Sequence, residues 1–166
     1  VFDIKKLNWM NSYYLKNTDD KKIAKLAKPF FLNEKIDISN SKKYLLIINH
    51  IKQRVNTLAE MPKESKIFYK NNNFSKDQLN ILNKYESQKL FKTILNKLQT
   101  GSNCNGKMFK DISIEAGKEC NLKGKDLFHP LRIAIFGNSD GPDIPVIYSI
   151  LEKNEIITRL SKAIND

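Results

Sequence analysis

The sequence has no long hydrophobic run and no N-terminal signal peptide. None of its 166 residues lies in a stretch approaching the roughly 18 consecutive apolar residues of a membrane span. The opening VFDIKKLNWM lacks the basic segment and the long apolar run of a secretory leader. We therefore expect no membrane partner. The first residue is Val1 rather than Met, which indicates a piece of a longer protein or a processed chain.

Cysteine and histidine are scarce. The two cysteines, Cys104 and Cys120, form no CxxC or Cys/His cluster, which argues against a zinc site. Two unrelated reduced thiols in a cytoplasmic protein are the simplest interpretation, although their spacing leaves a disulfide open. His50 and His129 have no Cys, Ser or acidic residue at a ligand-like or triad-like spacing. The sequence therefore predicts no catalytic residue, no cofactor-binding residue and no metal ligand.

Arginine is also rare, although the chain is strongly basic. Only three of its 29 basic residues are arginines, and the net charge is +11. Residues 1–70 carry 15 basic and 7 acidic groups, whereas residues 71–166 carry 14 and 11. This excess favours a polyanion partner, contacted more by the first half. The alternative is a solvated lysine surface, which an AT-rich genome produces by default.

Helical periodicity dominates the pattern, and strand-like alternation is scarce. With 40% hydrophobic residues, nine Phe and six Tyr, the chain can build a core. Residues 3–16 show an apolar stripe at helical spacing, formed by Ile4, Leu7, Met10 and Tyr14, with Trp9 expected to pack nearby. The sequence predicts an all-α fold. The expected helices are 21–31, a run from Ser39 or Ser41 to Gln53, 76–98, 108–120, 123–136, 142–151 and 155–164.

Capping and breaking residues refine these boundaries. Thr18 is expected to cap the second helix, and Pro29 to end or bend it. Pro62 is expected to halt a short turn that begins at Leu58. The polar stretch Asn71–Asn73 suggests a boundary between two helical subdomains, residues 1–70 and residues 71–166.

The segment 127–151 carries the clearest binding pattern. Arg132 lies on a short helix that is expected to stop at Gly137, and a polar loop leads to a new helix start at Pro142. Because a guanidinium can both pair bidentately and stack, an arginine here suits an anionic, planar partner such as RNA. Arg159, in the last helix, is expected to be a surface residue or a salt-bridge partner.

Both ends of the chain match motifs of one family. The opening VFDIKKLNWMNSYYLK fits the pattern F-D-x-x-K-L-x-W-M-N-x-x-Y-[IL], and in this it resembles the segment that follows the catalytic domain of the bacterial-type glutamate–tRNA ligases. The pattern matches Phe2, Asp3, Lys6, Leu7, Trp9, Met10, Asn11, Tyr14 and Leu15. The closing FHPLRIAIFGNSDGPDIPVIYSILEKNEIITRLSKAI is similar to the family's P-L-R-x-A-[LI]-[TF]-G, then G-P or T-P, then a helix ending L-G-K-E followed by R-L-x-x-A. Residues 71–121 are only compatible with the family.

The resemblance implies an all-α, helix-cage anticodon-binding domain with the two subdomains named above. Arg54 stands where discriminating members read the third anticodon base, a cytosine, and Arg132 stands where the family's P-L-R arginine meets the first base. Gly141 and Pro142 occupy the loop that meets the middle base, and Ile144 matches an apolar position near the first base. Some members have Thr at Gly141, so any middle-base contact here is expected to come from the backbone.

The resemblance also describes a larger enzyme. Its members attach glutamate to its tRNA with ATP and magnesium, in a catalytic domain with HIGH-like and KMSKS-like motifs. Neither motif occurs here, and His50-Ile51-Lys52 is not an equivalent. We therefore expect no adenylate formation by this chain alone. The expected partners are the anticodon loop of glutamate tRNA and the missing N-terminal catalytic domain, within a cytoplasmic monomer.

Two other functions stay open. One is a basic helical module that binds RNA or DNA without sequence preference, and the other is a protein-docking domain of a synthetase complex. For Arg54 and Arg132 the alternative role is a structural salt bridge or a helix cap.

Overall fold

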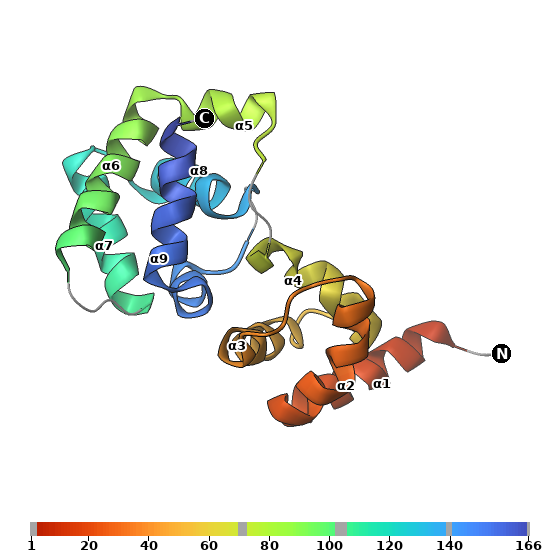
Figure 1. Cartoon of the computed structure of the whole chain (residues 1–166). Helices are drawn as coiled ribbons and strands as arrows, with labels where there is room; N and C mark the ends of the chain where they lie inside the picture. The colour runs from red at the N-terminus through yellow and green to blue at the C-terminus, as the bar shows by residue number, and fades with distance from the viewer. Residues whose placement is uncertain (1–2, 70–72, 102–105, 139–140, 166) are drawn as a thin grey trace. The chain divides into compact units, whose positions relative to one another are not determined.

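The computed structural model describes residues 3–69, 73–101, 106–138 and 141–165. Within these ranges the chain forms nine α-helices and one short 3-10 helix, and no strand, so the all-α prediction is confirmed (Figure 1). None of the described helices has the length and apolar character needed to cross a membrane. The chain divides into two units, residues 1–69 and residues 70–166.

The first unit contains four α-helices and the 3-10 helix. They are α1 (Ile4–Asn17), α2 (Asp20–Asn33), α3 (Ser41–Ile51), η1 (Leu58–Glu60) and α4 (Met61–Tyr69). Their core includes Phe31 of α2 and Phe68 of α4, both fully buried. Tyr44 of α3 packs edge-on against Phe31, with ring centroids 5.0 Å apart, and its hydroxyl donates to the Ala24 carbonyl at 2.8 Å. The α2–α3 pair is therefore held by both apolar packing and a polar contact.

One predicted helix cap in this unit is wrong. Asp19, not Thr18, caps α2, because its carboxylate accepts from the backbone N–H groups of Lys21 and Lys22. Thr18 instead donates its hydroxyl to the Tyr14 carbonyl at the end of α1. Adjacent Thr and Asp can both cap a helix, so the sequence pattern permits a shift of one residue.

Pro29 does not end α2, and Pro62 does not halt the chain after the turn at Leu58. Pro29 lies inside α2, which continues to Asn33. Pro62 lies in the first turn of α4 and is buried. A proline costs least in the first turn of a helix, because the N–H it lacks would have no helical acceptor there. The chain therefore passes from η1 directly into α4.

The second unit contains the other five helices. They are α5 (Lys76–Leu82), α6 (Tyr85–Thr100), α7 (Gly106–Glu119), α8 (Gly124–Phe136) and α9 (Ile144–Asn165). In Figure 1, α9 (blue) runs beside α6 and α7, and it packs on α8 as well. Phe91 of α6 and Phe109 of α7 are fully buried in this core. The predicted cap of α5 is confirmed, because Ser75 and Gln78 form a reciprocal capping box.

The last helix is kinked at Glu152. This residue has φ 61° and ψ 166°, a backbone conformation that essentially only glycine adopts without strain. The sequence predicted two helices here, with a break between Leu151 and Glu155, and the kink lies within that interval. In the family pattern L-G-K-E, a glycine follows the leucine, so Glu152 occupies a glycine position.

We expect Glu152→Gly to stabilise the protein by about 1 kcal/mol, because glycine removes the strain of the left-handed backbone but adds freedom to the unfolded chain. Urea unfolding of the two proteins measures the difference. Glu152→Ala is the matched control, since it removes the same side chain and keeps the strain. A glycine variant no more stable than the alanine variant would contradict the strain argument.

The predicted stripe on α1 is not buried. Ile4, Leu7, Met10 and Tyr14 are all exposed, as is Trp9, and Leu15 is the buried residue of this helix. The helix itself forms as predicted, capped by Asp3, whose carboxylate accepts from the N–H groups of Lys5 and Lys6. The pattern thus predicted amphipathicity correctly but not a covering partner.

Candidate nucleic-acid interface

Arg54 lies in the turn that follows α3. Its backbone N–H donates to the Ile51 carbonyl at 2.9 Å, which fixes the turn. Its side chain is exposed and makes no hydrogen bond or ion pair with any other residue that the structure describes. The guanidinium is therefore available to an external acceptor, and the alternative role as a structural salt bridge has no partner among the described residues.

A buried lysine anchors this turn. Lys52 is 7% exposed, and its ammonium lies 2.6 Å from an Asp20 carboxylate oxygen. The same ammonium donates to the Thr18 carbonyl at 2.8 Å, and Asn49 donates to the other Asp20 oxygen at 2.7 Å. The α1–α2 junction and the end of α3 are thus tied together two residues before Arg54.

The sequence did not reveal this anchor. Lys52 and Asp20 are 32 positions apart, and Lys52 belongs to a lysine-rich stretch in which no lysine stands out. The available signal is the acidic pair Asp19-Asp20 at the start of α2, a pattern that on its own is typical of a helix N-terminus. The structure assigns capping to Asp19 and the ion pair to Asp20.

The anchor makes the first unit sensitive to acid. Burial alone raises the pKa of the Asp20 carboxyl, but hydrogen bonds from Lys52 and Asn49, with the Lys52 charge, lower it overall below 3.8. A lowered pKa in the folded state means that the stabilisation is complete above the unfolded-state value and is lost as pH falls through the folded-state value. We therefore expect the melting temperature to decrease as the pH falls below about 4. In the Asp20→Asn variant this decrease should be less steep.

Thermal unfolding of both proteins between neutral pH and pH 2 checks this expectation. Asp37 also has a lowered pKa, through hydrogen bonds from Ser39, so part of the acid sensitivity should survive in Asp20→Asn. Identical pH profiles for the two proteins would show that the anchor contributes nothing.

The second part of the candidate interface lies at the C-terminal end of α8. Gly137 ends this helix with φ 68°, a left-handed conformation that suits glycine. Its carbonyl accepts from the Gln78 side-chain amide at 2.7 Å, which joins the loop to α5. Arg132 is half-buried one turn earlier, and its Nε is buried without a hydrogen-bond partner among the described residues. A buried donor without a partner is costly, so this guanidinium favours an added acceptor.

Gly141, Pro142 and Ile144 form the turn that enters α9. A Cβ at Gly141 would lie 3.1 Å from Cδ2 of the Phe136 ring, which is tighter than ordinary contact, so a larger residue requires Phe136 to shift. Pro142 and Ile144 are buried. In this conformation their side chains support the turn, and the groups that the turn can offer to a ligand are those of its backbone. Residues 139–140, which belong to the predicted polar loop, lie outside the described residues.

Within the second unit, Gly141 lies against the ring of Phe136, which ends α8, the helix that carries Arg132, and Ile144 begins α9. Arg54 belongs to the first unit. Arg159, the third arginine, is confirmed as a salt-bridge partner: it pairs with Glu155 at 2.7 Å. It is not a surface residue, because it is 6% exposed.

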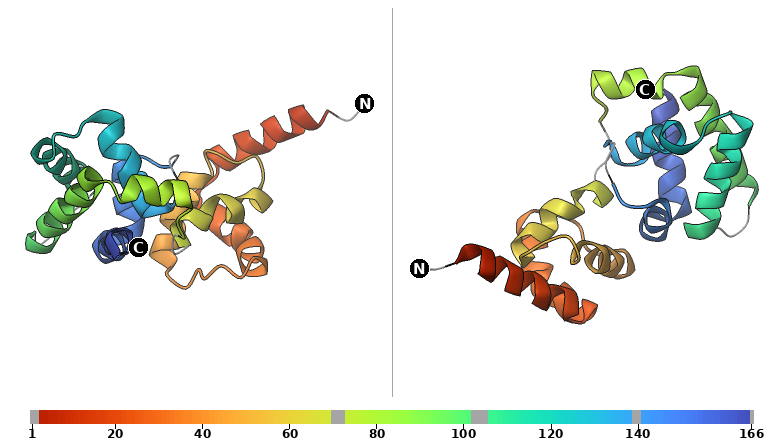
Figure 2. Two further views of the ribbon diagram at one scale, coloured as in Figure 1. Left: turned by 90° about the horizontal axis from the view of Figure 1, so that it is seen from above. Right: turned by 180° about the vertical axis from the view of Figure 1, so that it is seen from behind.

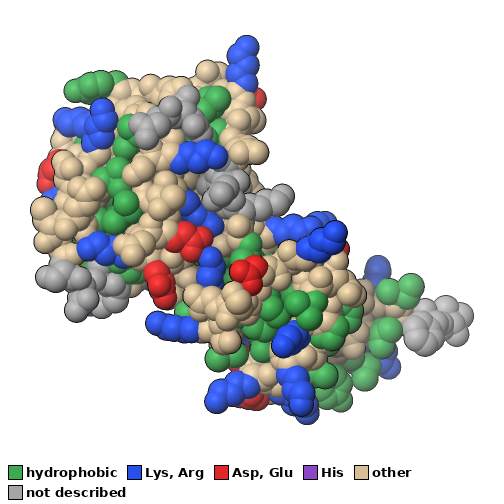
Figure 3. Space-filling view, viewed as in Figure 1, with side chains coloured by type: hydrophobic (Ala, Val, Ile, Leu, Met, Phe, Trp, Pro, Cys, Tyr) green, Lys and Arg blue, Asp and Glu red, His purple; other side chains and the backbone are tan. Residues whose placement is uncertain are grey.

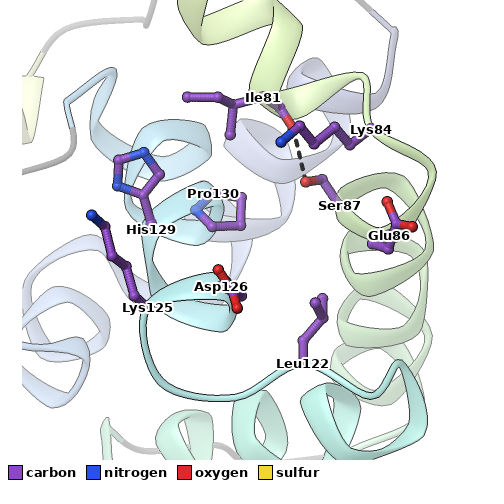
Figure 4. Close-up of a pocket in the computed structure, with 9 residues that line it drawn as sticks. All are labelled: Ile81, Lys84, Glu86, Ser87, Leu122, Lys125, Asp126, His129 and Pro130. Atoms are coloured by element: carbon purple, nitrogen blue, oxygen red, sulfur yellow. Dashed lines mark hydrogen bonds between the residues drawn. The ribbon is translucent and has the colours of Figure 1, made fainter.

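A basic face of α8 continues from Arg132. Lys125, His129 and Arg132 follow one another at i, i+4 and i+7, which places them on one side of the helix. Lys125 and His129 border a surface pocket of about 350 Å³, with Lys84 across from them and Asp126 between (Figure 4). Ser87, also at this pocket, donates its hydroxyl to the Ile81 carbonyl at 2.8 Å.

The side chains of this face suit the binding of a ligand. The pocket has an apolar floor and mixed charge, since Glu86 and Asp126 offset the basic groups. Nowhere among the described residues do three or more His, Cys, Asp or Glu side chains gather as a metal site requires. The face can thus offer cations to phosphates and an arginine to a base.

Known proteins resemble this chain throughout its length. The family model described as "Anticodon binding domain" matches residues 22–164. The glutamate–tRNA ligase of Natranaerobius thermophilus is 29% identical over 172 residues, covering 99% of this chain and 35% of the relative. That of Elusimicrobium minutum is 33% identical over 171 residues, covering 98% and 34%.

A solved structure gives the same fold. A glutamate tRNA ligase from Elizabethkingia meningosepticum superposes with a TM-score of 0.85 at 22% identity, over 99% of this chain and 32% of that one. The chain thus spans about a third of the length of the curated relatives that it matches. Because the family model covers most of its residues, this chain belongs to the anticodon-binding domain family.

Proposed function

We propose that this chain is the tRNA-reading part of a glutamate–tRNA ligase and binds the anticodon loop of glutamate tRNA. The observation that carries the proposal is the family match over residues 22–164, because it covers both units and both candidate arginines. The relatives' shared description as glutamate–tRNA ligases supports the choice of tRNA.

In this proposal each arginine meets one end of the anticodon. Arg54 pairs with the third base, a cytosine, through the fork of its exposed guanidinium. Arg132 meets the first base, and its buried Nε without a described partner gives it a donor to satisfy. The middle base meets the backbone at Gly141 and Pro142, where Phe136 leaves little room for a side chain. Ile144 holds this turn in place beside the first base.

The chemistry of the whole enzyme belongs to residues outside this chain. We propose that a catalytic domain, joined to this chain in the complete protein, attaches glutamate to the tRNA with ATP and magnesium in the cytoplasm. We propose that the complete enzyme acts as a monomer, and that this chain alone supplies only binding. The support is the share of the relatives that the chain covers, about a third.

One competing function has a specific observation in its favour. The basic face of Lys125, His129 and Arg132 would also attract any nucleic acid, because phosphate contacts carry no sequence information. A module of that kind would bind all tRNAs alike.

A binding titration against glutamate and glutamine tRNAs at two salt concentrations tests the proposal. We expect preference for glutamate tRNA at both concentrations. If about four phosphates of the single-stranded loop are neutralised, the affinity should fall roughly 50-fold between 50 and 200 mM salt. Equal affinities for the two tRNAs would support the non-specific module, and weak salt dependence would support protein docking instead.

A further inference from the structure

We propose that the apolar face of α1 is the docking surface for the part of the synthetase that lies outside these 166 residues. The inference rests on the proposed function, since it takes the complete protein to be a ligase of the relatives' length. It adds the surface through which the two parts meet.

The exposure of α1 is the first observation. Trp9 is 68% exposed, Ile4 65% and Tyr13 56%, although all three are large and apolar. Three further apolar residues of this helix are also exposed, namely Leu7, Met10 and Tyr14. A contiguous exposed patch of this kind marks an interaction surface in a soluble domain.

The placement of α1 is the second observation. Its first turns extend away from the other helices of the first unit, as the left view of Figure 2 shows. Nearer its end, Tyr14 and Leu15 line a pocket of about 300 Å³ together with Phe30 and Leu58, and Leu15 is buried there. In the space-filling view, hydrophobic side chains gather over this end of the first unit (Figure 3). Among the described residues of α1, Leu15 is the one that is buried, and the other large apolar side chains of this helix are exposed.

The chemistry of the face selects a protein as the occupant. Trp9 and Tyr13 stack with ring centroids 6.0 Å apart, which on its own would also suit an RNA base. However, Ile4, Leu7 and Met10 offer only aliphatic and thioether groups, which gain from burial against other apolar groups. RNA presents mainly polar edges and phosphates, so it leaves these three side chains without a suitable partner.

The length of the relatives favours the remainder of the same protein, rather than a second copy of this chain, as the occupant of the α1 face. About two-thirds of each relative lies beyond the region that this chain matches. A segment joined covalently to α1 acts at an effective concentration in the millimolar range, which a separate molecule does not reach.

Hydrogen exchange of the α1 amides tests the inference in two proteins, the 166-residue chain and the complete synthetase. We expect exchange to be at least about tenfold slower in the complete protein, because docking closes the local opening of the helix. Trp9→Asp in the complete protein should restore fast exchange in α1. Tyr85→Asp, at an exposed aromatic position of α6, should not. The amides of α6 serve as the internal reference for folding.

Three outcomes would overturn the inference. They are equal exchange of α1 in both proteins, slowing in the 166-residue chain as its concentration rises, and slowing only on addition of glutamate tRNA. The second outcome would identify another copy, and the third would identify RNA. Loss of tRNA preference with α1 still protected would instead sink the proposed function alone.

Discussion

Arg159→Ala is expected to lower the free energy of unfolding of the second unit by about 3 kcal/mol, because it removes a long buried side chain and the hydrogen bonds that its guanidinium makes. The guanidinium of Arg159 donates to the Ile135 carbonyl and to a Glu155 oxygen, both at 2.7 Å. The substitution leaves this carbonyl without its donor and opens a cavity beside α8.

Urea unfolding monitored by circular dichroism gives the difference. Glu155→Gln is the matched control, since Glu155 is partly exposed and its amide can still accept from Arg159; we expect a loss below about 1 kcal/mol. If the two variants lose the same stability, the effect belongs to the charge pair rather than to the buried guanidinium.

Arg54→Gln is expected to reduce discrimination between cytosine and guanine at the third anticodon base by about 1–3 kcal/mol, or roughly 5- to 150-fold in relative affinity. The guanidinium is exposed, and no described residue competes for it, so the substitution should leave folding unchanged. Glutamine keeps a polar group at the position but loses the bidentate cation.

Binding of glutamate tRNA and of a variant with guanine at the third anticodon base measures this discrimination. Lys25→Gln, at an exposed lysine of α2, is the control for loss of one positive charge in the same unit. This variant should weaken the binding of both RNAs equally. If Arg54→Gln does the same, Arg54 contacts phosphate and does not read the base.

The sequence predicted those features that depend on neighbouring residues. The capping box at Ser75 and Gln78 was predictable because both bonds form within one helical turn. Gly137 was predictable as the end of α8 because a left-handed residue there favours glycine. Most of the helices followed from apolar spacing, but the single helix predicted over residues 76–98 is two helices, α5 and α6. The family resemblance supplied the expected roles of Arg54 and Arg132, which stay predictions.

Features that depend on distant partners were not predictable. The burial of Arg159 depends on the Ile135 carbonyl, 24 positions away. Lys52 is buried because Thr18 and Asp20 meet it from another helix. Periodicity on α1 shows that one face is apolar, but it does not show whether the molecule covers that face.

One side chain in the second unit constrains which amino acids its position can accept. Gln78 accepts from the Ser75 N–H through its oxygen at 2.9 Å, and donates to the Gly137 carbonyl through its nitrogen at 2.7 Å. Either Glu or Gln completes a capping box, but only Gln has a donor left for a carbonyl. The start of α5 would accept Glu or Gln at position 78 equally well, but the carbonyl at the end of α8 excludes Glu. Two backbone segments that are distant in sequence therefore together determine a single amide side chain.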